Sequence, residues 1–294
     1  MQDFNVLHFS DLHLSEVRAY NLKNWNICLE EITTRRPDLV IVGGDMVLDD
    51  PDVQADQIFA RRQLDGIRAP WRAVPGNHDV GDSLPTPYQN QPVSDERIAR
   101  YKSLYGADRW HMDIPNWRLI GINSQLSASG LPAEKEQFEW LADTLSSAGD
   151  SRIAIFTHKP LCLDTIEEQT ISQFLVHPDS RRDLWKLIKQ FDVRLIASGH
   201  THRFRTLSCD GIPMVWAPTT AQVNLNMKSP KNGWPDQHAG FVWLRFRPNA
   251  VEWELVQPSA LVALDVTALS SKYGPMRNAP EYRLADLVVI SEPG

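Results

Sequence analysis

The chain has no long apolar run, few cysteines and no cluster of basic residues. No stretch approaches the roughly 20 apolar residues that a membrane-spanning helix needs, and the first residues lack the basic and apolar regions of a secretory signal. We therefore expect a cytoplasmic protein without membrane contact. Its three cysteines are widely separated and odd in number, which argues against a disulfide framework. The net charge of −7 and the absence of Lys/Arg runs argue against a nucleic-acid polymer as a partner.

The length and composition fit one large α/β domain. A chain of 294 residues with 42% hydrophobic content is long enough to build a full core. We assign residues 1–258 to this domain, and residues 259–294 to an apolar tail that packs on the domain or on a partner subunit. The sequence leaves open whether the protein is a monomer, a homodimer or a higher homo-oligomer.

Side chains that bind metals follow apolar runs at five separate places. Each run reads as a short buried strand that glycine or turn chemistry interrupts. The residues are Asp11 and His13, Asp45, Asn77, His158, and His200 with His202. We expect the two pairs at spacing i, i+2 to lie in extended segments, where both side chains point to the same side.

Amphipathic helices are predicted between several of these strands, at residues 20–34, 132–148 and 180–190. Alternating strands and helices favour parallel βαβ units, whose ligand sites lie beyond the carboxyl ends of the strands. We therefore expect one pocket at one edge of a sheet. After His202 the pattern changes to short strands near residues 204–217 and 240–255, which predict a second sheet.

The residue types themselves indicate a transition-metal site. Imidazole nitrogens combined with carboxylate and amide oxygens suit iron, manganese, zinc or cobalt, whereas a calcium or magnesium site would be rich in oxygen. Taken singly, a polar residue at the end of a strand is more often a turn cap or a satisfied core group. The joint arrangement favours metal binding, whereas His8 lies within a strand and is expected in the core.

The ordered motifs resemble those of the calcineurin-like metallophosphoesterases. They are Asp-x-His at 11–13, Gly-Asp at 44–45, Gly-Asn-His-Asp at 76–79, His158, and Gly-His-x-His at 199–202. A single motif is weak, but all of them in order are strongly specific. The chain is most similar to the class III cyclic-nucleotide phosphodiesterases and the bacterial glycerophosphodiesterases. This resemblance implies a four-layer α/β/β/α sandwich of two mixed sheets flanked by helices.

The resemblance also implies a centre with two ions, for which iron and manganese are the expected metals. Its ligand assignment places Asp11, His13 and His202 on one ion, Asn77, His158 and His200 on the other, and Asp45 between them. His78 is expected to contact a phosphate oxygen or to protonate the leaving alkoxide. Asp79 would orient the His78 ring, although a helix or turn cap is an equally good interpretation.

The predicted activity is hydrolysis of small phosphodiesters, such as cyclic nucleotides or glycerol- and alkyl-type diesters, by a hydroxide that bridges the two ions. An alternative is a phosphomonoesterase or nucleotide phosphatase, which would need extra cationic groups for a dianionic substrate. A third is a non-catalytic scaffold of the same fold. Such scaffolds look like chains that have lost ligands, whereas this chain keeps the complete set.

Two irregular segments are expected to shape the substrate pocket or simply to pack onto the domain. They are residues 80–93 with Tyr88, and residues 219–240 with Trp234. For His238 a surface loop is the better interpretation. Lys159 and Arg203 adjoin predicted ligands, and the sequence leaves open whether they touch phosphate or point to solvent.

Replacing Asn77 with Asp tests the charge of this centre. Two divalent ions carry four positive charges, and Asp11 and Asp45 supply only two negative ones, so a net positive charge remains for the phosphate. An Asn77→Asp variant should turn over more slowly while its metal content, measured by elemental analysis, is retained. Unchanged turnover would count against this charge argument.

Overall fold

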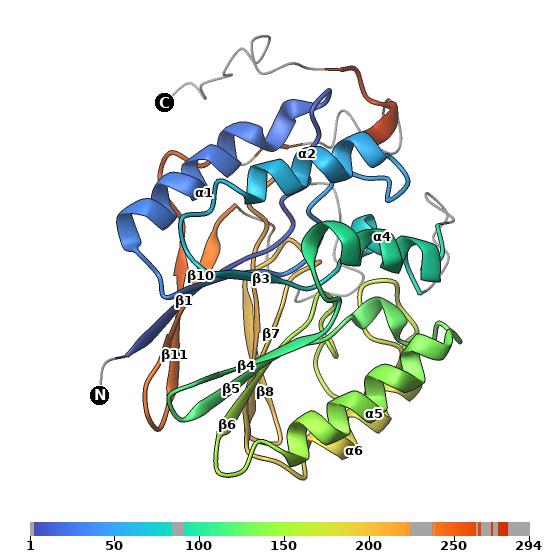
Figure 1. Cartoon of the computed structure of the whole chain (residues 1–294), viewed down its shortest axis with the longest axis vertical. Coiled ribbons are helices and arrows are strands. Elements are labelled where there is room, and N and C mark those ends of the chain that lie inside the picture. The colour runs from blue at the N-terminus through green and yellow to red at the C-terminus, as the bar shows by residue number, and fades with distance from the viewer. Residues whose placement is uncertain are drawn as a thin grey trace.

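The computed structural model describes residues 3–83, 91–223, 237, 239–262, 264–265, 272 and 276–281. In this part of the chain, two mixed sheets pack face to face, and helices cover both outer faces (Figure 1). The expected four-layer α/β/β/α sandwich is confirmed. The layers are separated by three hydrophobic cores. One core lies between the sheets and one lies under each pair of helices.

The first sheet has five strands in the order β11-β10-β1-β2-β3. Its strands are β1 (Phe4–Phe9), β2 (Leu39–Val42), β3 (Trp71–Ala73), β10 (Phe241–Phe246) and β11 (Val251–Val256). The neighbours β1, β2 and β3 run parallel, whereas β10 lies antiparallel to β1 and to β11. Helices α1 (Leu22–Arg35) and α2 (Gln54–Leu64) pack on its outer face.

The second sheet has six strands in the order β4-β5-β6-β7-β9-β8. They are β4 (Trp110–Ile114), β5 (Trp117–Gly121), β6 (Arg152–Phe156), β7 (Val193–Ser198), β8 (Arg205–Cys209) and β9 (Ile212–Trp216). The central strands run parallel and the two edge strands are antiparallel to their neighbours. Helices α5 (Pro132–Ser146) and α6 (Pro178–Ile188) cover its outer face.

The sequence predicted that the strands after His202 form a second sheet. The structure shows that they do not form a sheet of their own. Instead β8 and β9 extend the sheet of β6 and β7, while β10 and β11 extend the sheet of β1. Hydropathy patterns show that these segments are strands, but strand partners depend on packing that a local pattern does not encode. The prediction of strands was therefore right and the prediction of their grouping was wrong.

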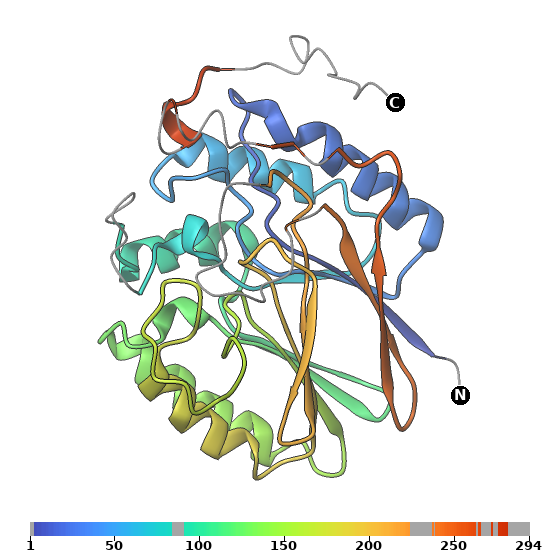
Figure 2. The same cartoon turned by 180° about the vertical axis from the view of Figure 1, so that it is seen from behind.

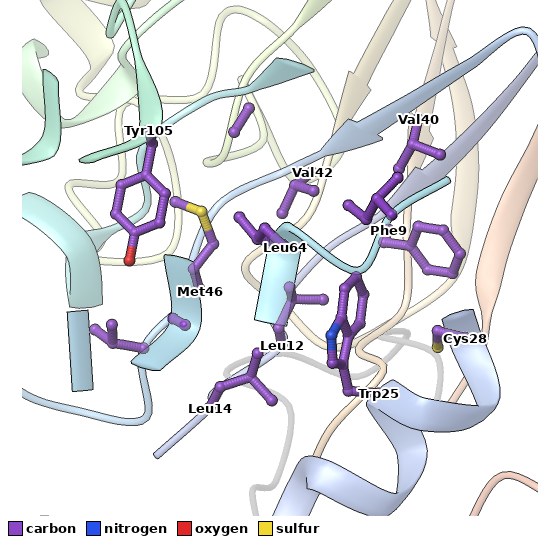
Figure 3. Close-up of a cluster of buried hydrophobic side chains, with 14 of the residues drawn as sticks. Phe9, Leu12, Leu14, Trp25, Cys28, Val40, Val42, Met46, Leu64 and Tyr105 are labelled. Atoms are coloured by element: carbon purple, nitrogen blue, oxygen red, sulfur yellow. The ribbon is translucent and has the colours of Figure 1, made fainter. Parts of the chain in front are cut away.

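Strand β2 shows why a continuous apolar run is needed. Leu39 and Ile41 lie in the core between the two sheets, whereas Val40 and Val42 lie in the core under the helices. Trp25 of α1 packs in the same outer core (Figure 3). Both faces of the strand are thus buried, which is the situation that a parallel strand inside a covered sheet requires.

Several elements were not predicted from the sequence. Helix α2 is polar, and its weak apolar stripe gives little periodic signal. Helix α4 (Asp95–Tyr105) starts at Ser94, whose side chain accepts a hydrogen bond from the Arg97 amide. The short elements are α3 (Asn77–Val80) and the 3₁₀ turns Ala19–Asn21, Ser124–Leu126 and Met276–Asn278. None of the helices among the described residues combines the length and apolar character that crossing a lipid bilayer requires.

The described parts of the tail lie on the domain, on the side that carries α1 and α2 (Figure 1, Figure 2). The Tyr20 hydroxyl donates to the Pro280 carbonyl at 2.6 Å, and Asn24 donates to the Val262 carbonyl at 2.7 Å. Met276 packs against Tyr20 in a small apolar cluster. The apolar run at 284–290 lies outside the described residues, and the boundary at 258 remains a prediction.

Candidate metal centre

The predicted ligands lie together beyond the carboxyl ends of strands from both sheets. Strands β1, β2 and β3 of the first sheet and β6 and β7 of the second precede them. Three overlapping groups of potential donors form there, with donor atoms within 4.8 Å of one another inside each group. The groups are Asp11, Asp45, His158 and His200; Asp11, His13 and His202; and His13, Asp45 and His78. This cluster of donors thus lies where the edges of two sheets meet, rather than at one sheet as expected.

The backbone at these residues differs from the expected extended segments. Five of the residues adopt positive φ angles in the left-handed region, namely Asp11 (57°), His13 (46°), Asp45 (54°), His200 (68°) and His202 (56°). This conformation costs roughly 1–2 kcal/mol per residue for a non-glycine side chain. Backbone hydrogen bonds from Asp11 to Gly44 and from His13 to Asp45, each 3.0 Å, hold the first two segments together. Both residues of each i, i+2 pair are therefore left-handed rather than extended.

The glycines of the motifs allow these segments to approach closely. A Cβ atom on Gly76 would overlap the carboxylate and the amide of Asp45, and one on Gly199 would overlap the Ser10 hydroxyl. Such overlaps involve backbone or buried atoms that have little freedom to move. The glycine in Gly-Asn-His-Asp and in Gly-His-x-His is thus a steric requirement of the pocket.

Each histidine of the centre is tied to a backbone carbonyl through one ring nitrogen. The distances are His13 Nδ1 to Leu48 2.9 Å, His78 Nδ1 to Asp49 2.6 Å, His158 Nδ1 to Gly43 2.7 Å, His200 Nε2 to Gln173 3.1 Å and His202 Nδ1 to Gln222 2.9 Å. A carbonyl oxygen only accepts hydrogen bonds, so each of these nitrogens carries the proton. The other nitrogen of a neutral ring is then bare, which is the arrangement found around metal-binding histidines.

These bare nitrogens face one another at short range. His13 Nε2 lies 3.0 Å from His202 Nε2, and His158 Nε2 lies 3.0 Å from His200 Nδ1. Two nitrogen lone pairs at this distance repel unless a proton on one ring or a metal ion lies between them. The buried Asp11 Oδ1 also has no hydrogen-bond partner among the described residues. The donor set therefore fits bound cations, and its mixture of nitrogen and oxygen suits borderline transition metals.

Asp45 occupies the middle of the cluster. Its Oδ2 lies 3.3 Å from His158 Nε2, 3.7 Å from His78 Nε2 and 3.9 Å from His13 Nε2, and its Oδ1 accepts the His78 amide at 2.9 Å. Asn77 Oδ1 lies 3.2 Å from His158 Nε2. Burial opposes protonation of His158, but Asp45 outweighs it and raises the pKa of that imidazole to about 9. The buried carboxylates thus create a negative potential that attracts cations.

Asp79 serves as a cap for the loops of this pocket. Its carboxylate accepts the backbone amides of Asp45, Met46 and Gly76 at 2.8–2.9 Å. Burial and the neighbouring Asp45 raise the pKa of Asp79 to about 7. These contacts favour the role of a cap. They do not favour Asp79 as the group that orients the His78 ring, because His78 Nδ1 binds the Asp49 carbonyl instead.

Asp49 is a residue of the centre that the sequence reasoning missed. In addition to its carbonyl contact, its Oδ1 lies 3.7 Å from His78 Nδ1. Burial opposes protonation of His78, but Asp45 and Asp49 together raise the pKa of the imidazole. The signal in the sequence was an acidic residue four positions after Asp45, in a segment that was not assigned to any element.

The two basic residues beside the ligands are buried. Lys159 is 0% exposed and its Nζ pairs with Asp82 Oδ1 at 2.5 Å. Arg203 is 4% exposed and donates from Nη1 to the Thr201 carbonyl at 2.9 Å. The option that they point to solvent is therefore wrong. Tyr88, Trp234 and His238 lie outside the described residues, and the loop predictions at 80–93 and 219–240 remain predictions.

Comparisons with known proteins agree with this geometry. The model of the calcineurin-like phosphoesterase family matches residues 4–204. The chain belongs to this family of phosphoric ester hydrolases. The chain is 28% identical over 214 residues to a probable cyclic nucleotide phosphodiesterase of Moraxella catarrhalis (strain BBH18). These residues cover 69% of this chain and 73% of the relative.

A second relative is the glycerophosphodiester phosphodiesterase of Enterobacter lignolyticus (strain SCF1). It is 34% identical over 168 residues, which cover 53% of this chain and 56% of the relative. The fold is similar to that of a purple acid phosphatase from yellow lupin (Lupinus luteus), with a TM-score of 0.68, 18% identity and coverage of 90% of this chain and 53% of that one. The predicted family resemblance is thus confirmed.

The buried pair of Lys159 and Asp82 should be strongly coupled in stability. An Asp82→Asn variant leaves the Lys159 ammonium buried without its counter-ion, and the free energy of unfolding should fall by about 3–5 kcal/mol. The double variant Lys159→Met, Asp82→Leu should recover most of this loss. Urea denaturation monitored by circular dichroism would measure both effects.

A matched control is the exposed pair of Lys135 and Glu139 on α5. Glu139→Gln should change the free energy of unfolding by less than about 1 kcal/mol, because exposed ion pairs are screened by water. Equal effects of Asp82→Asn and Glu139→Gln would show that the buried pair is not a stabilising contact.

Proposed function

We propose that this phosphoesterase hydrolyses small phosphodiesters with the help of two transition-metal ions. Cyclic nucleotides and glycerol- or alkyl-type diesters are the proposed substrates. The observation that supports this most strongly is the facing pairs of bare imidazole nitrogens around Asp45. One pair, His13 with His202, lies beside Asp11, and the other, His158 with His200, lies beside Asn77.

Each side chain has a defined task in this proposal. Asp11, His13 and His202 would hold one ion, Asn77, His158 and His200 would hold the other, and Asp45 would be shared by the two groups. When bound, two divalent ions would supply an activated water molecule and neutralise charge on the phosphate. Iron and manganese are the metals that we propose. The Asp11 and Asp45 carboxylates leave part of the positive charge of two such ions uncompensated, which favours an anionic substrate.

His78 is the proposed acid or phosphate contact. Its side chain is 16% exposed, whereas the side chains of Asp45 and His158 are 2% and 0% exposed. Asp49 fixes the ring through Nδ1, so Nε2 is the atom available to a phosphate oxygen or to the leaving alkoxide. A ring fixed in this way donates or delivers a proton without first having to reorient.

The burial of Lys159 and Arg203 supports a diester over a monoester. A phosphomonoester carries nearly two negative charges at neutral pH and would gain from an additional cationic side chain at the pocket. Neither basic residue that adjoins the ligands provides one, since Lys159 is paired with Asp82 and Arg203 binds a backbone carbonyl. A phosphodiester carries a single negative charge and needs no such residue.

A comparison of two chromogenic esters tests this proposal. Protein loaded with manganese, iron or zinc should hydrolyse bis(p-nitrophenyl) phosphate with a higher kcat/KM than p-nitrophenyl phosphate. Removal of the metals with a chelator should abolish both reactions. Preference for the monoester would favour the phosphomonoesterase alternative, and loaded protein inert to every small ester would favour a scaffold.

Replacing His78 with Gln should lower kcat for the diester by about 10²–10⁴-fold, because proton transfer typically contributes this much. Metal content should stay the same, since His78 is not among the assigned ligands. The matched control is His111→Gln, which changes an exposed histidine of β4. A His78→Gln variant as active as His111→Gln would exclude His78 from the reaction.

A further inference from the structure

Two buried cysteines from different segments lie in contact. Cys162 follows strand β6, four residues after His158, and Cys209 ends strand β8. Their Sγ atoms lie 3.8 Å apart, and the Met214 Sδ lies 3.9 Å from Cys162 Sγ. Both cysteines are free thiols, as is Cys28 of α1, which is buried in the core of the other sheet.

We propose that Cys162 and Cys209 form a reversible disulfide when the protein meets a small disulfide of the glutathione type. A disulfide bond is about 2.05 Å long, so the two sulfur atoms must approach by only about 1.8 Å. No other pair of cysteines in the chain offers this contact among the described residues, because Cys28 packs in a different core. The inference is independent of the proposed substrate.

The surrounding structure already holds the two segments side by side. The Arg205 guanidinium, at the start of β8, donates to the Leu163 carbonyl and to the Asp164 carboxylate, both at 2.7 Å. The Cys209 thiol also lies 3.8 Å from the Asp164 carbonyl. Closing the bond by side-chain rotation and a small backbone shift costs the weak Cys209 S–H contact to Asp164, whereas the Arg205 hydrogen bonds do not involve the thiols.

Access to the pair is from the side of Cys209. Strand β8 is the edge strand of its sheet, and Cys209 is 9% exposed whereas Cys162 is 0% exposed. The Cys209 sulfur attacks the small disulfide, forms a mixed disulfide and releases one thiol, which takes up the proton of Cys209. Cys162 then attacks the Cys209 sulfur and releases the second thiol with its own proton. The two cysteines lose two electrons, and the small disulfide gains them.

Burial makes this exchange slow rather than impossible. It raises the pKa of both thiols above the ordinary value for cysteine, and the thiolate is the attacking species. The oxidised state, once formed, closes a ring from residue 162 to residue 209, which contains His200 and His202. Cross-links over long loops restrict the unfolded chain, so the oxidised protein should unfold at a higher temperature than the reduced protein.

The test starts with metal-loaded protein that is incubated overnight with excess oxidised glutathione. The protein is then unfolded, its free thiols are alkylated with iodoacetamide, and its intact mass is measured before and after alkylation. Before alkylation, oxidised protein should be about 2 Da lighter than reduced protein. Because the chain has three cysteines, it should take up one label in place of three. Its midpoint of thermal unfolding should rise, and reduction with dithiothreitol should reverse every change.

Two variants identify the bond. After oxidation, Cys28→Ser should take up no label, which locates the bond between the remaining two cysteines. Cys209→Ser should take up two labels and show no rise in its unfolding temperature. Three labels on oxidised wild-type protein, or a stable glutathione adduct without the mass loss, would overturn the proposal. The wild-type measurement decides the matter even where a variant folds poorly.

Discussion

The structure of this protein depends on a set of imidazole rings held in one tautomer by backbone carbonyls. Because each ring donates one N–H to a carbonyl oxygen, its second nitrogen points bare into the pocket, and two pairs of these nitrogens face each other at 3.0 Å. The arrangement is repulsive unless a proton on one ring or a metal ion lies between the facing nitrogens, and as a donor set it fits metal ions. The buried Asp11 and Asp45 carboxylates add negative charge that favours cations at this place.

The fold places these groups close together, but some of the residues must adopt backbone conformations of higher free energy. Parallel strands of two sheets end at the same place, so residues far apart in the chain converge. Left-handed residues such as Asp45 and His200 are individually unfavourable, and the close approach at Gly76 is possible only because glycine has no Cβ atom. The Asp79 carboxylate offsets part of this cost by accepting several amides from the loops. The strained pocket is therefore stabilised by the layers around it.

The sequence predicted the four layers and the convergence of the candidate ligands because both leave local signals. Apolar runs such as 39–42 mark buried strands, and Asp-x-His or Gly-His-x-His mark their ends. Other features depend on tertiary contacts that a local pattern does not contain. The left-handed backbone of Asp11 and His13 follows from pairing with the segment at Asp45, and the division of the late strands between the sheets follows from packing. Asp49 was missed because its role depends on where the His78 ring lies.

Anomalous scattering from a crystal of manganese-loaded protein tests the central claim most directly. Two peaks should appear about 3.5–4 Å apart, one nearest Asp11, His13 and His202 and the other nearest Asn77, His158 and His200, with Asp45 between them. A single peak, or peaks away from the facing imidazole nitrogens, would contradict the assignment of these residues to a centre with two ions.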